Sequence, residues 1–309
     1  MRNFFVFVLL LSSFFISKAQ EKIHKSSKTI IIATYQYSDN DRLKNIQPLA
    51  AILEKKIGYK VVSKSYPTVF SLITALNDKK VDLALISTFG YMLFDASNDA
   101  TKMEAVAALE VRTGERDNYK TAFVVPWDSK ITSFETIKEE AKNMKLELVA
   151  EGSTSGNLVP RLILTGAGIV NAETQFKSVN YGKTHQRTIE AVANGQADLA
   201  AMGSVDYFSF INNKENNQKV RLIKMSPEIP LGPVLLNKQL PKQLRAEIIT
   251  VLLKLHQQNP EVLTSVKSGW SEARDADRFI AIKSSYYQPF KSGLGNPDEL
   301  SRIIRQFTK

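Results

Sequence analysis

The chain alternates between segments typical of β-strands and segments typical of amphipathic helices. A first cycle runs strand, helix, strand, helix, strand, and it occupies residues 29–34, 41–56, 59–62, 67–77 and 81–85. The first helix places its apolar residues on one face and ends before Gly58, where a left-handed cap is easily formed. Such alternation predicts parallel strands with helices on both faces of each sheet.

A second cycle of the same order follows. It occupies residues 146–150, 156–165, 176–179, 184–193 and 197–201. At an offset of 116 positions, the segment 75–84 aligns with 191–200, and Ala75, Asp82, Leu83 and Ala84 match their counterparts. Four identities in ten positions can arise by chance. We interpret them as two lobes of like topology, each with a helix that ends just before a short strand.

The end of the chain returns to the first lobe. Residues 223–233 carry three prolines that stiffen a crossing, and a helix start is expected at Asn296-Pro297-Asp298-Glu299. The C-terminal helices are expected to pack on the first lobe. The predicted lobes are residues 28–125 plus 234–309 for lobe 1 and residues 126–233 for lobe 2. Hinge crossings are expected near residues 124–127 and 227–233.

The first nineteen residues are typical of a secretory signal peptide. Arg2 precedes an apolar run over residues 4–16, and the small residues Ser17 and Ala19 favour cleavage before Gln20. The run is shorter than the roughly 20 residues that span a bilayer. Residues 1–19 therefore predict export, and we expect the mature protein in the periplasm. The chain has no cysteine, so we expect neither disulfides nor a lipid anchor on an N-terminal cysteine.

The charge of the chain favours anionic partners. Without Arg2 and Lys18, the 41 basic residues fall to 39 against 31 acidic ones, a net charge of +8. Taken by itself, this charge is more simply explained by a solvated, lysine-rich surface. Nucleic acid is a poor candidate, because the lysines are scattered and do not alternate with aromatic residues in a stripe.

The segment Ser153-Thr154-Ser155-Gly156 stands where a strand should end and a helix should begin. The free amides of a first helical turn bind anions, and flanking hydroxyls add further donors. The alternative is structural: Ser153 caps the helix and Gly156 eases a turn. Both explanations fit the residues equally well.

Further candidate residues come from other strand ends. Ser87 and Thr88 occupy the equivalent position in the first lobe, before a helical run. His185 lies in a first helical turn, where its imidazole can donate to an oxyanion, although a lone histidine on a helix is more often a surface residue. Tyr35 and Tyr37 can line the cleft or cover the sheet edge. Asp206 can orient His185 or receive a cationic group, with helix capping as its structural alternative.

Enzyme and metal motifs are weak in this chain. Gly182-Lys183-Thr184 ends like a phosphate-binding P-loop, but position 177 is Lys instead of Gly. The segment around Ser153 is not a nucleophile elbow, because its central residue is Thr154. The three histidines have spacings unlike a metal site. We therefore expect no enzyme activity, no metal and no cofactor.

These motifs together resemble a known family. Its pattern is matched by Ser153-Thr154-Ser155-Gly156, Leu158-Val159-Pro160, residues 182–185, residues 188–195 and Asp198. The chain is similar to the PhnD-like phosphonate-binding periplasmic proteins of ABC importers. The resemblance implies a two-lobed, type II-like periplasmic binding protein, with a mostly parallel sheet in each lobe. It also implies that Ser153, Thr154, Ser155 and His185 hold the phosphonate oxygens.

Two departures from the family bear on the ligand. The first lobe carries Ile86-Ser87-Thr88-Phe89 where the family often has other residues, so these contacts are less well matched. Members that take aminoalkyl phosphonates place a carboxylate in the second crossing, which here reads Pro230-Leu231-Gly232-Pro233. Because an unpaired buried ammonium is costly, we expect phosphite, methylphosphonate or phosphate instead.

The resemblance implies an ABC permease as the partner of a monomeric binding protein. Two other hypotheses stay open. The loaded protein can dock on the outer domain of a sensor histidine kinase, or the chain can be a secreted phosphoesterase.

Overall fold

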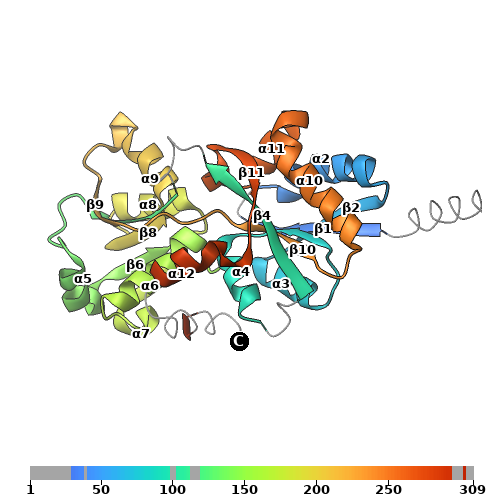
Figure 1. Ribbon diagram of the computed structural model, residues 1–309. Helices are drawn as coiled ribbons and strands as arrows, with labels where there is room; N and C mark the ends of the chain where they lie inside the picture. Colours follow the sequence, from blue (N-terminus) through green and yellow to red (C-terminus); the bar gives the residue numbers. More distant parts are fainter. Residues whose placement is uncertain (1–28, 38–39, 98–101, 112–118, 294–301, 304–309) are drawn as a thin grey trace, which may run out of the picture.

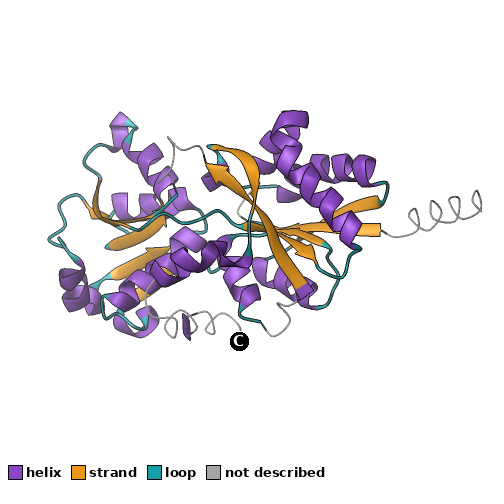
Figure 2. Cartoon of the chain, in the orientation of Figure 1, coloured by secondary structure: helices purple, strands orange, loops and turns teal. Residues whose placement is uncertain are grey.

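The computed structural model describes residues 29–37, 40–97, 102–111, 119–293 and 302–303. The predicted signal peptide and the helix start expected at residues 296–299 lie outside these ranges. Two β-sheets, each with its own helices, lie side by side along the molecule (Figures 1 and 2). We call each sheet with its helices a lobe. The α/β fold class predicted from the sequence is confirmed.

Lobe 1 is built on a six-stranded sheet of order β11-β4-β10-β3-β1-β2. Its strands are β1 Thr29–Tyr35, β2 Lys60–Tyr66, β3 Leu83–Leu85, β4 Met103–Val111, β10 Pro233–Asn237 and β11 Ala276–Ala281. The first three strands are parallel to one another, whereas β10, β4 and β11 join as antiparallel neighbours. The sheet is therefore mixed, and its parallel strands are the three strands of the first cycle.

Lobe 2 is built on a five-stranded sheet of order β7-β6-β8-β5-β9. Its strands are β5 Thr121–Pro126, β6 Lys145–Leu148, β7 Ser178–Tyr181, β8 Leu199–Gly203 and β9 Val220–Met225. Again three strands are parallel, and β5 and β9 are antiparallel. The expectation of mostly parallel sheets misses these added strands, because their pairing partners lie far away in the sequence.

The crossing expected near residues 124–127 falls inside β5. Val124 and Val125 are fully buried there, and the strand pairs with both β8 and β9. The chain therefore enters lobe 2 before Thr121. The proline-rich second crossing does lie between the lobes, since β9 ends at Met225 and β10 of lobe 1 begins at Pro233.

Helices flank both sheets (Figure 2). Those that belong to lobe 1 are α2 Arg42–Ile57, α3 Val69–Asn77, α4 Thr88–Asp95, α10 Lys242–Gln258, α11 Pro260–Lys267 and α12 Gln288–Gly293. Those of lobe 2 are α5 Phe134–Glu140, α6 Val159–Gly166, α7 Ala172–Gln175, α8 His185–Ala193 and α9 Ser204–Ile211. Helices α10 and α11 pack against α2, as expected for the C-terminal part of the chain. None of the helices in the described ranges is long and apolar enough to cross a membrane.

The two lobes repeat one topology. Strand order β2-β1-β3 in lobe 1 corresponds to β7-β6-β8 in lobe 2, and all of these pairs are parallel. The aligned aspartates, Asp82 and Asp198, also make equivalent hydrogen bonds. The Asp82 carboxylate accepts from the Ile31 amide at 3.0 Å, and the Asp198 carboxylate accepts from the Lys145 amide at 2.7 Å. The predicted likeness of the two cycles is thus confirmed.

The parallel strands position the functional loops. In open α/β sheets, ligands bind beyond the carboxyl ends of such strands. Here β1 leads to Tyr37, β3 leads to Ser87, β6 leads to Ser153, and β8 leads to Ser204. The helix after each strand therefore begins at the cleft between the lobes.

Candidate functional site

The lobe 2 side of the cleft is a helix start rich in hydroxyl groups. Residues Thr154–Leu158 form a π-helix, η4, that continues into α6. The Ser153 hydroxyl caps it by accepting from the Gly156 amide at 3.0 Å. The first amides of any helix lack an intrahelical acceptor, so the amides of Thr154 and Ser155 can donate elsewhere. The capping explanation for Ser153 is thus correct, and the same loop contacts lobe 1 through Thr154.

Gly156 is required by close packing. A Cβ at this position would lie 2.2 Å from Val149 Cγ2, so the helix start packs directly on the end of the preceding strand. This packing buries the loop. The exposed fractions of Ser153, Thr154 and Ser155 are 4%, 3% and 1%.

His185 comes to the same place from α8. Its Nδ1 atom accepts from the Gly203 amide at 2.9 Å, so the neutral ring carries its proton on Nε2. The Ser155 hydroxyl and the imidazole both lie within 3.4 Å of the position a Cβ on Gly203 would take. Asp206 Oδ2 is 3.9 Å from Nδ1, too far for a hydrogen bond, so Asp206 affects the ring only through its charge.

Lobe 1 contributes the start of α4. The Ser87 hydroxyl caps this helix by accepting from the Gly90 amide at 3.2 Å. The Thr88 hydroxyl donates to the Pro230 carbonyl at 2.6 Å, so its proton ties α4 to the second crossing. The Phe89 amide donates to Thr154 Oγ1 at 3.1 Å and links the two lobes directly.

Two tyrosines complete the site, and only one of them was predicted. The Tyr37 hydroxyl lies 3.5 Å from His185 Nε2. Burial raises the pKa of Tyr37, and a hydrogen bond with Ser153 acts in the opposite direction. Burial also raises the pKa of Tyr119, whose hydroxyl bonds to the side chains of Ser155 and Thr154. Both hydroxyls therefore stay protonated and can donate to an anion.

Tyr35 does not reach the site. Its side chain is only 2% exposed and belongs to the core of lobe 1. The ring packs on the guanidinium of Arg42 at 4.6 Å. Of the predicted residues, the structure thus brings together the Ser153–Gly156 loop, Ser87, Thr88, Tyr37 and His185, which we call the cradle, with Tyr119 as an added member.

A cavity of about 630 Å³ lies in the cleft between the lobes, next to the cradle. Both lobes line it, and among its residues are Tyr37, His185, Asp206, Arg42 and Glu272. Neither Arg42 nor Glu272 was predicted as a site residue from the sequence. Glu272 lies next to the second crossing as well, where it lines a small apolar cavity together with Gly232.

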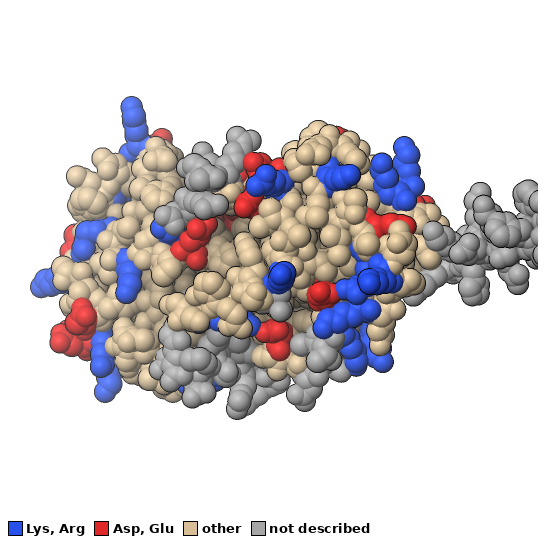
Figure 3. All heavy atoms as spheres, in the orientation of Figure 1, with Lys and Arg blue, Asp and Glu red and all other residues tan. Residues whose placement is uncertain are grey.

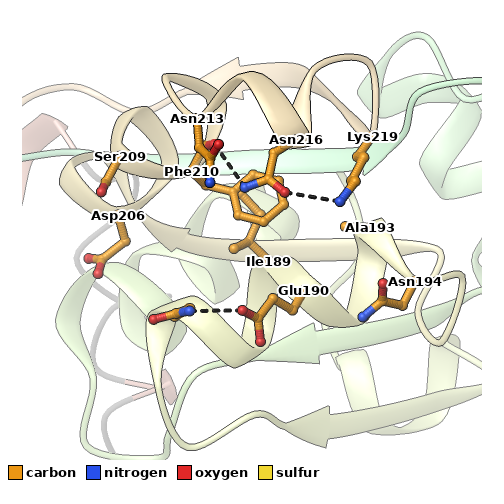
Figure 4. A pocket seen from close by; sticks show the side chains of 11 residues that line it. Ile189, Glu190, Ala193, Asn194, Asp206, Ser209, Phe210, Asn213, Asn216 and Lys219 are labelled. Carbon is orange, nitrogen blue, oxygen red and sulfur yellow. Dashed lines mark hydrogen bonds between the residues drawn. The ribbon is translucent and has the colours of Figure 1, made fainter.

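A second hollow of about 460 Å³ lies between α8 and α9 (Figure 4). Its lining residues Gln186, Glu190 and Asp206 also line the cleft cavity, so the two hollows adjoin. The Gln186 amide donates to the Glu190 carboxylate at 2.8 Å, while Asn216 accepts from Lys219 at 3.0 Å. Four of its polar side chains are thus paired with one another.

Gly232 explains why this position of the second crossing carries no acid, and the acid of the crossing, Glu228, is exposed. A Cβ there would lie 1.9 Å from the Ile86 carbonyl oxygen and 2.8 Å from the backbone of Ser87. Any side chain at this position would collide with the backbone that leads into α4.

The charge of the protein does not gather at one patch in the view of Figure 3. Lys and Arg side chains are scattered over both lobes and are interspersed with Asp and Glu. Within the described part of the chain, no group of three or more His, Asp or Glu residues is arranged to hold a metal ion. The site therefore offers an anion mainly hydroxyls, amides and an imidazole.

A family model matches most of this chain. Residues 31–287 fit the model described as the periplasmic substrate-binding protein of phosphonate ABC transporters. The phosphonates-binding periplasmic protein of Escherichia coli K12 is 24% identical over 265 residues, which cover 82% of this chain and 76% of that protein. The probable phosphite-binding protein PhnD1 of Prochlorococcus marinus is 22% identical and covers 72% of this chain and 74% of its own.

Solved structures have the same fold. PhnD1 from Prochlorococcus marinus in complex with methylphosphonate has a TM-score of 0.66 at 19% identity, covering 86% of this chain and 97% of its own. A binding protein of a phosphonate ABC transporter from Pseudomonas aeruginosa has a TM-score of 0.65 at 20% identity and covers 90% and 93%. The predicted two-lobed periplasmic binding protein fold is confirmed.

Proposed function

Because this chain belongs to the family of phosphonate-binding periplasmic proteins of ABC transporters, we propose that it captures a phosphorus oxyanion or simple phosphonate between its lobes and delivers it to a permease. Members of this family are binding proteins and not enzymes, which leaves no reason to retain a phosphoesterase. The observation that carries the proposal is the buried cradle, in which two helix starts meet at the Phe89–Thr154 bond while Tyr37 and His185 line the adjoining cleft cavity.

The chemistry of the cradle suits a tetrahedral oxyanion. Helix-start amides and the hydroxyls of Ser155, Tyr37 and Tyr119 donate to the oxygens, while His185 presents its Nε2 proton. Ser153 and Thr154 hold the loop in place through their own bonds to Gly156 and Phe89. Tyr35, which lies in the core, has no part in this proposal, and Asp206 acts only on His185.

For the ligand we favour phosphite, methylphosphonate or phosphate over an aminoalkyl phosphonate. Gly232 leaves no room for a carboxylate at its own position in the crossing, so an ammonium would lack a partner there. Glu272 offers the alternative. It lines the cleft cavity and makes no hydrogen bond or ion pair with another described residue, so an aminoalkyl phosphonate is the second candidate.

The remaining parts of the proposal concern the whole protein in the cell. We propose that residues 1–19 direct export, that the protein works as a monomer in the periplasm, and that the two lobes close on the ligand about the crossings. A sensor kinase as the partner, in place of a permease, would change the output and not the site.

A thermal-shift panel tests the ligand. It comprises phosphite, phosphate, methylphosphonate, 2-aminoethylphosphonate, sulfate and arsenate. A ligand at 100 times its dissociation constant stabilises the folded state by about 2.7 kcal/mol, which raises the melting temperature measurably. The largest shift is expected with phosphite, methylphosphonate or phosphate. A larger shift with 2-aminoethylphosphonate would select the second candidate, and no shift with any phosphorus anion would refute the ligand class.

A further inference from the structure

Arg42 is a buried charge that forms no ion pair with any residue that the structure describes. It is only 3% exposed, at the first position of α2. Its Nε atom donates to the Gly269 carbonyl at 2.7 Å, but buried Nη1 has no hydrogen-bond partner. No carboxylate among the described residues forms an ion pair with it. Burying an unpaired charge is costly, so its presence calls for an explanation.

The surroundings of Arg42 compensate for its charge only in part. The guanidinium carbon lies 4.6, 4.9 and 4.6 Å from the ring centroids of Tyr35, Tyr37 and Trp270. Aromatic faces attract a cation, most strongly where water is excluded. The start of a helix, in contrast, disfavours a cation because the helix dipole is positive there. Arg42 is thus held firmly in a position that does not favour α2.

This charge lies directly behind the cradle. Arg42 packs on the ring of Tyr37, and the Tyr37 hydroxyl lies 3.5 Å from His185 Nε2. Arg42 also lines the cleft cavity. Burial is the main cause that raises the pKa of Tyr37; the charge of Glu272 raises it further, and the smaller effect of Arg42 lowers it. Arg42 therefore acts on Tyr37, which lines the cleft cavity with it.

The other charges at the cavity do not take over this role. Arg187 is exposed, so solvent screens its charge. The Glu190 carboxylate already accepts from Gln186, and Asp206 lies 3.9 Å from His185. Glu272 lines the cavity without an ion pair to Arg42. Among the described residues that line this cavity, Arg42 is thus the permanent positive charge that is buried.

We propose that Arg42 is the buried counter-charge of the captured anion and acts on it through the ring layer of Tyr37. The inference rests on the proposed function, because it requires an anion in the cradle. The cradle itself consists mainly of neutral groups, so a buried cation behind it provides the charge compensation that a doubly charged oxyanion needs on entering a dry site. Arg42 thereby favours oxyanions of higher charge.

The test compares three variants by calorimetry with methylphosphonate and with phosphate. Arg42→Met keeps much of the side-chain volume and removes the charge, Arg42→Lys keeps the charge, and Arg187→Met removes an exposed charge from the same cavity. We expect Arg42→Met to bind each anion at least about tenfold more weakly than wild type. This loss should be the same at about 0.5 M salt, several times physiological ionic strength, because salt screens a buried charge poorly. Arg187→Met should bind within about threefold of wild type, and raised salt should remove that difference.

The melting temperature of the ligand-free protein separates this role from a structural one. Removing an unpaired buried charge should leave that temperature unchanged or raise it. The inference fails if Arg42→Met binds as tightly as wild type, or if Arg42→Lys binds no better than Arg42→Met. The charge of Arg42 then does not stabilise the bound anion, while the proposed function still stands. A wild-type protein that binds neither anion overturns the proposed function and the inference together.

Discussion

Ser155 has the hydroxyl in the cradle with the fewest structural duties. The Ser153 hydroxyl caps η4 and Thr154 Oγ1 accepts the interlobe bond from Phe89. In Ser155 it is the carbonyl oxygen, not the hydroxyl, that accepts from Thr121, at 2.7 Å. The Ser155 hydroxyl bonds to Tyr119 and lies against Gly203. It can therefore be removed without breaking the helix cap or the link between the lobes.

Replacing Ser155 by Ala should weaken anion binding by about 1.5–3 kcal/mol, the usual value of a hydrogen bond to a charged group. The melting temperature of the ligand-free protein should change little, and calorimetry with scanning fluorimetry measures both quantities. Ser209→Ala, an exposed serine in the hollow between α8 and α9, serves as the matched control. An unchanged affinity in Ser155→Ala would remove this loop from the site.

Single residues of the cradle were predictable where a local pattern marks them. Ser153, Ser155 and His185 lie at helix starts that follow strands, and the topology brings such positions together. Tyr119 was missed because its place depends on how it meets Ser155 and Thr154 of lobe 2, and Arg42 because its partners Gly269 and Trp270 lie far away in the sequence. Arg42 did give one sign, since a cation in the first turn of a helix opposes the dipole.

At the scale of elements, the second crossing is fixed against α4 by two contacts. Thr88 donates to the Pro230 carbonyl, and Gly232 allows the crossing to touch the backbone at Ile86. The buried Tyr287 hydroxyl donates to the Leu231 carbonyl at 2.6 Å from the other side. A side chain at position 232 would push the crossing off the helix start that forms half of the cradle.

Gly232→Ala should therefore destabilise the protein by about 1–3 kcal/mol or more, the range for overpacking, and more than an ordinary Gly→Ala change. Urea denaturation measures the free energy of unfolding. Gly166→Ala is the matched control, because a Cβ there meets no atom within 4 Å and its effect should be neutral or slightly stabilising. Equal stability of the two variants would show that the crossing adapts freely.

Elements defined by local patterns were predicted closely. The helix expected at residues 41–56 is α2 at Arg42–Ile57, and the one expected at 184–193 is α8 at His185–Ala193. The π-helix was not foreseen, since its start at Thr154 precedes the helix expected from Gly156. Strands β4, β5, β9, β10 and β11 make the sheets mixed, and the sequence alone does not reveal such long-range pairings.

At the scale of the molecule, the two lobes share apolar packing as well as the cradle. Leu158, Val159 and Leu162 of lobe 2 belong to the same buried cluster as the core of lobe 1. Together with the Phe89 to Thr154 bond, they hold the lobes against each other. An anion in the cradle would add bonds to both sides, so its binding should favour this arrangement over a more open one.

Spin labels across the cleft test this expectation. The chain contains no cysteine, so labels attach only at introduced positions. Ser271→Cys and Gln186→Cys place one label on each lobe, at exposed residues that line the cleft cavity. The distance distribution between the labels should shorten and narrow when methylphosphonate, or the anion that stabilises the protein most, is added.

A pair within lobe 1, Ser271→Cys with Lys44→Cys, is the control, and its distribution should not respond to ligand because both labels move with one rigid lobe. Suppose calorimetry shows that the doubly labelled protein binds the anion while the interlobe distances stay as they were. The lobes would then already be held together by the Leu158 cluster without ligand, and the cradle would have to exchange its anion by local opening near Tyr37 and His185.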